Sequence, residues 1–228
     1  MTGDAATGRQ QRDGFLAGAA DDWFERNRRL SDHSPLDRFD DMIAAHLRPG
    51  GAVLEVGCAD GRRLRRLAAL GPAQSRLVGI DPSARAVEVG RAGEPALELG
   101  VGTADALPFE DAEFDTVVLG FCLYLCDPGL LPQIVAHTDR VLADGGTLAI
   151  VDFDPPMPRR REYRHEPGLW SYKMDYAKPF LAYPSYTLAE TLSISHHAAV
   201  WSEDPSERVA LKVLKKSLAH GWADEADS

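Results

Sequence analysis

The sequence predicts an α/β fold in which helices cover both faces of a mostly parallel β-sheet. Segments typical of strands and helices alternate through residues 51–153, as parallel strands joined by crossover helices require. The segment Phe114–Phe121 is almost continuously apolar, which is typical of a strand buried on both faces. Ligands bind such sheets at the carboxyl ends of the strands, so we expect the functional residues at that edge.

The composition excludes several classes of protein. Hydrophobic residues make up 44% of the 228 residues and charged residues 26%, so the chain can bury an ordinary core. With 25 Lys and Arg against 35 Asp and Glu, the formal net charge is −10, which disfavours nucleic-acid binding because phosphates are also anionic. The longest apolar stretch, Val117–Cys126, is too short to cross a bilayer. A polar N-terminus and three cysteines indicate a cytoplasmic protein with reduced thiols and no membrane partner.

The first fifty residues divide into a tail and a helical region. Residues 1–20 are polar at the start and rich in Gly and Thr, so we expect a flexible tail. Apolar residues recur at helical spacing between Asp21 and Leu47, with a break at Pro35. Residues 21–50 are therefore predicted to form helices that act as a lid.

Residues 51–216 carry the alternating elements of the sheet. Predicted strands cover 53–58, 76–80, 97–101, 114–121 and 147–153, and predicted helices cover 62–70, 83–91 and 130–142. Two later segments, 187–194 and 208–216, are predicted to be the final strands. Residues 217–228 are expected to be a C-terminal tail. The basic run Arg62–Arg66 on the first of these helices is expected to be a solvated face.

An insertion interrupts the alternation between residues 154 and 186. It holds five of the six tyrosines and six of the 15 prolines of the chain. Such a segment is too aromatic for a disordered linker. We therefore expect a cap over a pocket that binds a polar or ring-bearing small molecule.

Three acidic residues at successive strand ends point to a ligand site. Glu55 precedes the turn Gly57-Cys-Ala-Asp-Gly61, where glycines allow a tight turn and a close approach of a ligand to the backbone. Asp81 ends the second predicted strand and Asp105 follows the third. A carboxylate at the tip of the second strand can accept hydrogen bonds from both hydroxyls of a ribose. The carboxylate after the third strand can accept one from an exocyclic amine.

Five motifs then occur in a fixed order. They are VLEVGCADG at 53–61, GIDPS at 79–83, ADALPF at 104–109, FDTVV at 114–118 and LADGGTL at 142–148. Together they resemble the motifs of class I S-adenosylmethionine-dependent methyltransferases, over roughly residues 50–153. The sequence departs from the family at Ala59, where many members have glycine, and a small residue should be tolerated there.

The resemblance implies a fold, a cofactor and a set of binding residues. The fold is a Rossmann-like, seven-stranded, mostly parallel sheet whose last strand is antiparallel, and the cofactor is S-adenosylmethionine, with S-adenosylhomocysteine as the product. The implied cofactor-binding residues are Glu55, Gly57, Cys58 and Gly61 around the methionine end, Asp81 and Pro82 at the ribose, Asp105 and Ala106 at the adenine, Phe121 near the reactive methyl, and Arg26 at the cofactor carboxylate.

The catalytic residues are harder to identify from the sequence. Methyl transfer depends mostly on positioning and desolvation, and it needs a base only where the acceptor must lose a proton. The candidates are His165, Tyr172 and His196. We choose His165 first, because it lies in the aromatic insertion beside the basic run Arg159–Arg161. No residues have the spacing of a metal site, so no metal is expected.

We therefore expect a methyltransferase that acts on an O or N atom of a small metabolite such as a sugar, a nucleoside or an amino-acid derivative. A composition rich in Ala, Arg and Gly suggests a role in secondary metabolism by association alone. One alternative is a non-catalytic cofactor-binding scaffold or regulator, and another is a nicotinamide-dependent oxidoreductase, although the turn is not G-x-G-x-x-G. The sequence leaves a homodimer open.

Overall fold

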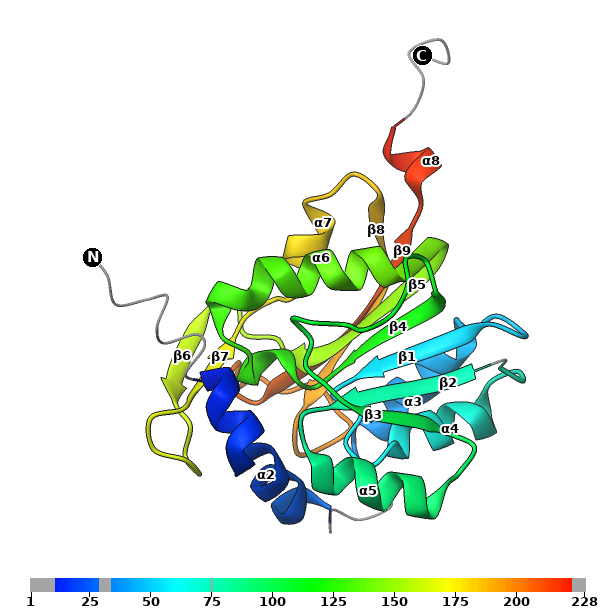
Figure 1. The fold of residues 1–228 in the computed structure, drawn as a ribbon. Coiled ribbons are helices and arrows are strands. Elements are labelled where there is room, and N and C mark those ends of the chain that lie inside the picture. The colour runs from blue at the N-terminus through cyan, green and yellow to red at the C-terminus, as the bar shows by residue number, and fades with distance from the viewer. Residues whose placement is uncertain (1–10, 29–33, 75, 223–228) are drawn as a thin grey trace.

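A seven-stranded sheet forms the centre of the computed structural model, which describes residues 11–28, 34–74 and 76–222 (Figure 1). Its strands are β1 (Ala52–Val56), β2 (Arg76–Asp81), β3 (Glu98–Val101), β4 (Phe114–Gly120), β5 (Leu142–Phe153), β8 (Tyr186–Ser195) and β9 (Arg208–Lys216), in the order β3-β2-β1-β4-β5-β9-β8. The first five are parallel, and β9 is antiparallel to both β5 and β8. The predicted mostly parallel sheet with an antiparallel last strand is confirmed.

The topology of this sheet places a crevice between β1 and β4. From β1 the chain runs outward through β2 and β3, and it then returns to the other side of β1 to form β4 and β5. At such a reversal of strand order the loops that follow neighbouring strands diverge, and ligands bind between them.

Helices cover the two faces of the sheet, as the sequence predicts. On one face α6 (Leu131–Val141) and α7 (Lys178–Leu181) pack on side chains that include Leu54, and on the other face α3 (Asp37–Ala45), α4 (Arg62–Leu70) and α5 (Ala84–Gly93) pack on side chains that include Val53 (Figure 1). Val53 and Leu54 are adjacent and both fully buried, because successive side chains of a strand point to opposite faces. A continuous apolar run is therefore needed in the central strands.

The strands agree with the predicted segments to within a few residues, except that β5 begins at Leu142, five residues before the predicted start. Leu142 pairs with Phe114, and the register shifts between Phe114 and Thr116. Extra residues of β5 bulge out at this register shift, and Gly145 among them has a φ of 72°. The gap between the predicted helix at 130–142 and the predicted strand at 147–153 is thus part of one long strand with an irregular register.

The N-terminal helix begins earlier than predicted. Residues 11–27 are helical, through η1 (Phe15–Ala19) and α2 (Ala20–Asn27), so residues 11–20 do not form the expected tail. Phe15, Ala19 and Ala20 are buried against Leu169, which lies too far along the chain for a local pattern to reveal. Residues 1–10, the rest of the predicted tail, lie outside the described residues, as do residues 223–228.

The aromatic insertion forms a hairpin beside this helix (Figure 1). Its strands are β6 (Arg159–Glu162) and β7 (Trp170–Lys173). Gln11 ties the two segments together, since its side-chain amide donates to the Trp170 carbonyl at 3.0 Å and accepts from the Trp170 N–H at 3.0 Å. The remaining short elements are η2 (Leu123–Leu125), η3 (Pro128–Leu130) and α8 (Leu218–Gly221). None of the helices in the described ranges is long and apolar enough to cross a membrane.

Candidate functional site

Two cavities meet at the carboxyl ends of β1 and β4. The first encloses about 120 Å³ and extends toward Asp81 and Asp105, and the second encloses about 570 Å³ and extends toward Glu55 and α4. Residues that line both are Trp23, Gly57, Gly120 and Phe121. The crevice predicted from the strand order is therefore one elongated site with two arms.

In the first cavity Asp81 is held by the backbone around it. Its carboxylate accepts hydrogen bonds from the N–H groups of Ala59 and Ser83, each at 2.8 Å. Burial raises the pKa of Asp81, and these two hydrogen bonds act against that rise. Each carboxylate oxygen still has acceptor capacity, so Asp81 can also receive two hydroxyl groups from a ligand.

Asp105, also in the first cavity, is paired with an arginine that the sequence analysis missed. Its buried carboxylate accepts from the Arg12 guanidinium at 2.9 Å, and this hydrogen bond raises the pKa of Arg12. Arg12 lies on the N-terminal helix, in a segment that the sequence suggested was a tail. No pattern around Arg12 indicates this contact, since it depends on how the helix docks.

The N-terminal helix is also held at the first turn of α5. One carboxylate oxygen of Asp21 accepts from the Ser83 hydroxyl at 2.6 Å and from the Arg85 N–H at 3.0 Å. Trp23 donates from its indole N–H to the Tyr124 hydroxyl at 3.2 Å. These contacts hold the helix beside the cavities, both of which Trp23 lines.

In the second cavity Glu55 has one paired oxygen and one unpaired oxygen. Oε1 accepts from Arg63 at 2.6 Å, whereas Oε2 is buried and has no hydrogen-bond partner among the described residues. Burial raises the pKa of Glu55 to about 7; Arg63 lowers it, and the nearby Asp40 raises it further. A buried oxygen without a partner is costly, so Oε2 is suited to receive a cationic group of a ligand.

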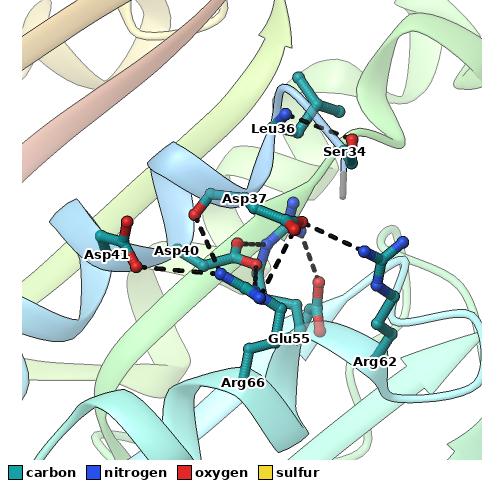
Figure 2. Close-up of polar contacts among 9 residues, drawn as sticks. Ser34, Leu36, Asp37, Asp40, Asp41, Glu55, Arg62 and Arg66 are labelled. Carbon is teal, nitrogen blue, oxygen red and sulfur yellow. Dashed lines mark hydrogen bonds and ion pairs between the residues drawn. The ribbon is translucent and has the colours of Figure 1, made fainter. Parts of the chain in front are cut away.

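The predicted solvated face of α4 is wrong, because Arg62, Arg63 and Arg66 pair with acidic residues of α3 and β1 (Figure 2). Arg63 and Arg66 donate to the two oxygens of Asp40 at 2.8 and 2.9 Å, and Asp40 is buried. Arg62 donates to Asp37 at 3.2 Å. Carboxylates buried between two helices need partners, and the sequence spacing of the arginines did not reveal where those acids lie.

The glycine turn after β1 is required by packing. Gly57 has a φ of 77°, and a Cβ atom there would lie 2.6 Å from the Cβ of Cys122. Gly61 also has a φ of 77° and begins α4, but it packs on Leu97 and lines neither cavity. Ala59 occupies the left-handed region at a φ of 48°, so the turn keeps the conformation that glycine favours.

Beside the shared wall of the cavities lies an aromatic cluster, which we define as Phe121, Tyr124, Phe153 and His196. The Phe121 ring centroid lies 5.0 to 5.5 Å from the other three, and Phe121 stacks on His196 with an interplanar angle of 12°. Phe121 has a φ of 62°, which is strained for a bulky residue and is found mostly at functional sites. The four rings lie at or just after the carboxyl ends of β4, β5 and β8, so three separate strand ends contribute to the cluster.

Of the three candidate catalytic residues, His196 alone belongs to this cluster. Burial, followed by His197 and Lys173, lowers the pKa of His196, so its imidazole is neutral at neutral pH. His165 is exposed on the turn between β6 and β7, beside Tyr163, and lines neither cavity. Tyr172 is half-buried in β7.

The predicted cofactor residues divide into two groups. Those that line a cavity are Glu55, Gly57, Cys58, Asp81, Pro82, Asp105 and Phe121. Gly61, Ala106 and Arg26 do not line either cavity. Ala106 is exposed in a turn, where its N–H donates to the Thr103 carbonyl at 3.2 Å. Arg26 is exposed and donates to the Tyr163 hydroxyl at 3.2 Å.

Asp152 is a buried carboxylate that the sequence analysis did not single out. It accepts from the N–H groups of Phe153 and Tyr124 at 2.7 and 3.2 Å, and burial raises its pKa to about 7. Its position at the carboxyl end of β5 follows the same rule that indicated Asp81, so the signal was present.

The three cysteines are thiols whose pKa burial raises, which disfavours the reactive thiolate. Within the described ranges, no group of three or more His, Cys, Asp or Glu residues is arranged to hold a metal ion.

Comparison with known proteins finds a family model that matches the central part of the chain. Residues 53–146 match the family model of a methyltransferase domain. That range contains β1 to β4, the glycine turn and the cavity-lining residues Glu55, Asp81 and Asp105. The range that matches is close to the one whose motifs carry the resemblance.

Curated relatives match over a similar part of the chain. An uncharacterized methyltransferase of Synechocystis is 34% identical over 108 residues, which is 47% of this chain and 50% of that protein. A demethylmenaquinone methyltransferase of Symbiobacterium thermophilum is 32% identical over 124 residues, which is 52% of this chain and 49% of the relative. The chain thus spans about half the length of these curated relatives.

A solved structure matches over nearly the whole chain. The 1,6-didemethyltoxoflavin-N1-methyltransferase of Burkholderia thailandensis superposes with a TM-score of 0.70, covers 95% of this chain and 92% of its own, and is 14% identical. That structure contains 1,6-didemethyltoxoflavin and S-adenosylhomocysteine. At this identity the likeness shows the fold, including the late strands that the family model leaves out.

Proposed function

We propose that this chain, whose residues 53–146 match the model of a methyltransferase domain, is a class I S-adenosylmethionine-dependent methyltransferase. It would transfer a methyl group from S-adenosylmethionine to an O or N atom of a small ring-bearing molecule. The activity of the whole chain, its cofactor and its acceptor are all part of this proposal. A cytoplasmic location and self-association stay predictions from the sequence.

The observation that carries the proposal is the series of three carboxylates along the cavities. Glu55, Asp81 and Asp105 come from β1, β2 and the loop after β3, which are neighbours in the sheet. S-adenosylmethionine has an ammonium, a ribose diol and an adenine amine along its length, and each of these groups donates hydrogen bonds. The acceptors of the protein therefore follow the same order as the donors of the cofactor.

The residues present fit this cofactor. Glu55 Oε2 is buried without a partner in the described part of the chain and would receive the ammonium group. Asp81 retains acceptor capacity for the ribose, and Asp105 would accept from the adenine amine once Arg12 moves aside. When bound, S-adenosylmethionine would supply a methyl group on a positively charged sulfur. An electron pair of the acceptor can bond to the methyl carbon, and the sulfur of S-adenosylhomocysteine then leaves.

The part of the site beyond Phe121 would hold the acceptor. Phe121 lines both cavities and contacts the rest of the aromatic cluster, which can bind a planar ring by stacking. His196 is our candidate base in preference to His165, because a neutral imidazole inside the cluster can take a proton from an acceptor O–H or N–H group. The named acceptors of two similar proteins, demethylmenaquinone and 1,6-didemethyltoxoflavin, also contain planar rings, which supports this class.

Calorimetric titration of the purified chain with S-adenosylhomocysteine, S-adenosylmethionine and NAD tests the proposal. We expect micromolar affinity for the first two and no binding of NAD. The variant Asp81→Asn should bind S-adenosylhomocysteine about 10- to 100-fold more weakly, since a hydrogen bond to a charged group contributes about 1.5–3 kcal/mol.

Asp111→Asn is the matched control, because Asp111 is an exposed carboxylate paired with Arg140 at 2.9 Å. It should bind the ligand as the parent chain does. Binding of NAD alone would instead support the oxidoreductase alternative. Binding of S-adenosylhomocysteine without methyl transfer to any acceptor would support a regulator or scaffold.

A further inference from the structure

One lysine of the described structure differs from the others that are not fully exposed. Lys212, Lys215 and Lys216 each place their ammonium within 3.0 Å of a carboxylate, a hydroxyl or a backbone carbonyl. Lys173 is also half-buried, but its ammonium makes no hydrogen bond or ion pair with any residue that the structure describes. A half-buried cation without such a partner is unusual, and its charge is available to a ligand.

The ammonium of Lys173 lies over the aromatic cluster. It is 3.2 Å from the centroid of the Phe153 ring, a distance at which a cation is attracted by the face of the ring. Phe153 in turn contacts Phe121, with ring centroids 5.0 Å apart. Lys173 is therefore separated by a single aromatic ring from Phe121, where the two cavities meet.

The carboxylates near Lys173 do not pair with its ammonium, so its charge can attract an anion. Burial, followed by the nearby Arg161, lowers the pKa of Lys173 to about 8, while Asp152 and Glu207 act in the opposite direction. The carboxylate of Asp152 is already bonded to backbone N–H groups, and Glu207 lies within 3.7 Å of His197. The ammonium therefore meets no acceptor oxygen of a described residue, and its N–H groups that do not face the Phe153 ring can donate to a ligand.

We infer that Lys173 and the aromatic cluster form the acceptor site for a planar aromatic molecule that carries an anionic group, such as a carboxylate or a phenolate. The rings of the cluster bind the flat faces of the acceptor, and Lys173 binds its anionic group. This inference rests on the proposed function and narrows it. A neutral acceptor such as a simple sugar would gain nothing from the charge on Lys173.

Three probes of similar size separate the two parts of this inference. 2-Naphthoate is planar and anionic, 2-naphthamide is planar and neutral, and decalin-2-carboxylate is anionic but not planar. We expect calorimetry on the chain saturated with S-adenosylhomocysteine to show about tenfold tighter binding of 2-naphthoate than of either other probe, because only it uses both the stacking rings and the charge. Equal affinities for all three would overturn the inference.

Two variants of Lys173 and one control sharpen the test. Lys173→Met keeps an apolar chain over Phe153 and should reduce the affinity for 2-naphthoate to that for 2-naphthamide, whereas Lys173→Arg should keep the preference. Lys178→Met removes an exposed lysine and should change neither affinity. If Lys173→Met, folded as judged by its thermal unfolding, still prefers 2-naphthoate tenfold, another group binds the anion and the inference is wrong.

The outcomes also separate this inference from the proposed function. S-adenosylhomocysteine should bind Lys173→Met as tightly as it binds the parent chain, since Lys173 lines neither cavity. Failure of the parent chain to bind S-adenosylhomocysteine would defeat the proposed function. The same probe titrations without that ligand would still decide whether Lys173 selects planar anions.

Discussion

Two regions of the site are built in different ways. We call the region around Glu55, Asp81 and Asp105 the proposed cofactor side, and the aromatic cluster with Lys173 the proposed acceptor side. The three carboxylates on the cofactor side lie between Glu55 and Asp105, within the segment that matches the family model. The acceptor side combines rings and a lysine from the ends of β4, β5, β7 and β8, most of them beyond that segment. On our proposal, the cofactor is thus bound by local motifs, and the acceptor by segments that come together only in the fold.

The two sides also differ in charge. Both acids and arginines line the two cavities of the proposed cofactor side, where Arg12 pairs with Asp105 and Arg63 pairs with Glu55. On the acceptor side the half-buried Lys173 makes no ion pair with any described residue. We therefore expect Glu55 to stabilise a cationic group of the cofactor and Lys173 to stabilise an anionic group of the acceptor. This arrangement would align the two small molecules around Phe121.

The variant with the largest expected effect removes the candidate base. With an acceptor that loses a proton, His196→Gln should reduce kcat by about 100-fold or more, since general base catalysis contributes about 100- to 10,000-fold. The affinity for S-adenosylhomocysteine should not change. Steady-state kinetics together with calorimetry measure both quantities.

The control for this prediction is His165→Gln, which alters an exposed histidine of the β6–β7 turn. Its kcat should equal that of the parent chain. If His165→Gln loses activity and His196→Gln does not, the first choice from the sequence was correct and our assignment of the acceptor side is wrong.

A smaller effect concerns pH and the cofactor side. Because the pKa of Glu55 is raised to about 7, part of this carboxyl is protonated near neutral pH, and only the ionised form attracts an ammonium group. The affinity for S-adenosylhomocysteine should therefore rise with pH by up to about tenfold between pH 6 and pH 8. Calorimetry across this range measures the slope.

Glu55→Gln should flatten this dependence, because the amide does not titrate. It should also weaken binding at pH 8, where the parent carboxylate is ionised. Gln74, whose amide donates to the Pro72 carbonyl at 2.6 Å, is remote from the cavities, and Gln74→Glu should retain the parent slope. An unchanged slope in Glu55→Gln would show that a different group titrates.

The smallest effect is expected at Arg12 of the N-terminal helix. Arg12 pairs with Asp105 at 2.9 Å, and its side chain is 34% exposed. Because partly exposed ion pairs contribute about 0.2–1 kcal/mol, Arg12→Gln should release Asp105 and tighten the binding of S-adenosylhomocysteine about two- to fivefold. Arg26→Gln, at the arginine that the sequence suggested, should leave the affinity unchanged. Weaker binding by Arg12→Gln would mean that Arg12 contacts the ligand.

Most of the fold was predictable because it rests on short-range patterns. Continuous apolar runs predict the buried strands, and glycine turns predict where they end. The same patterns predict Asp81 and Asp105, because position at a strand end is a local property. Asp152 follows the same rule at the end of β5 and was missed only because no further motif drew attention to it.

The pairing of charged residues was not predictable from such patterns. The arginines of α4 have the spacing of a solvated face, but Asp40 of α3 is buried against them. The helical segment at 11–20 was missed for a similar reason, since Phe15 packs on Leu169 far along the chain. Pairing and docking are properties of two surfaces, and the sequence shows each surface without its partner.

By itself, the sequence determined the α/β sheet, the glycine turn after β1 and the placement of Glu55, Asp81 and Asp105 near the strand ends. Only the tertiary structure decided that Phe121, Phe153 and His196 form one cluster, that Lys173 lies over it, and that His165 lies on an exposed turn. The physical reason is one of range. Hydrophobic periodicity and turn chemistry act over a few residues, whereas stacking of rings and burial of a charge depend on segments that only folding brings together.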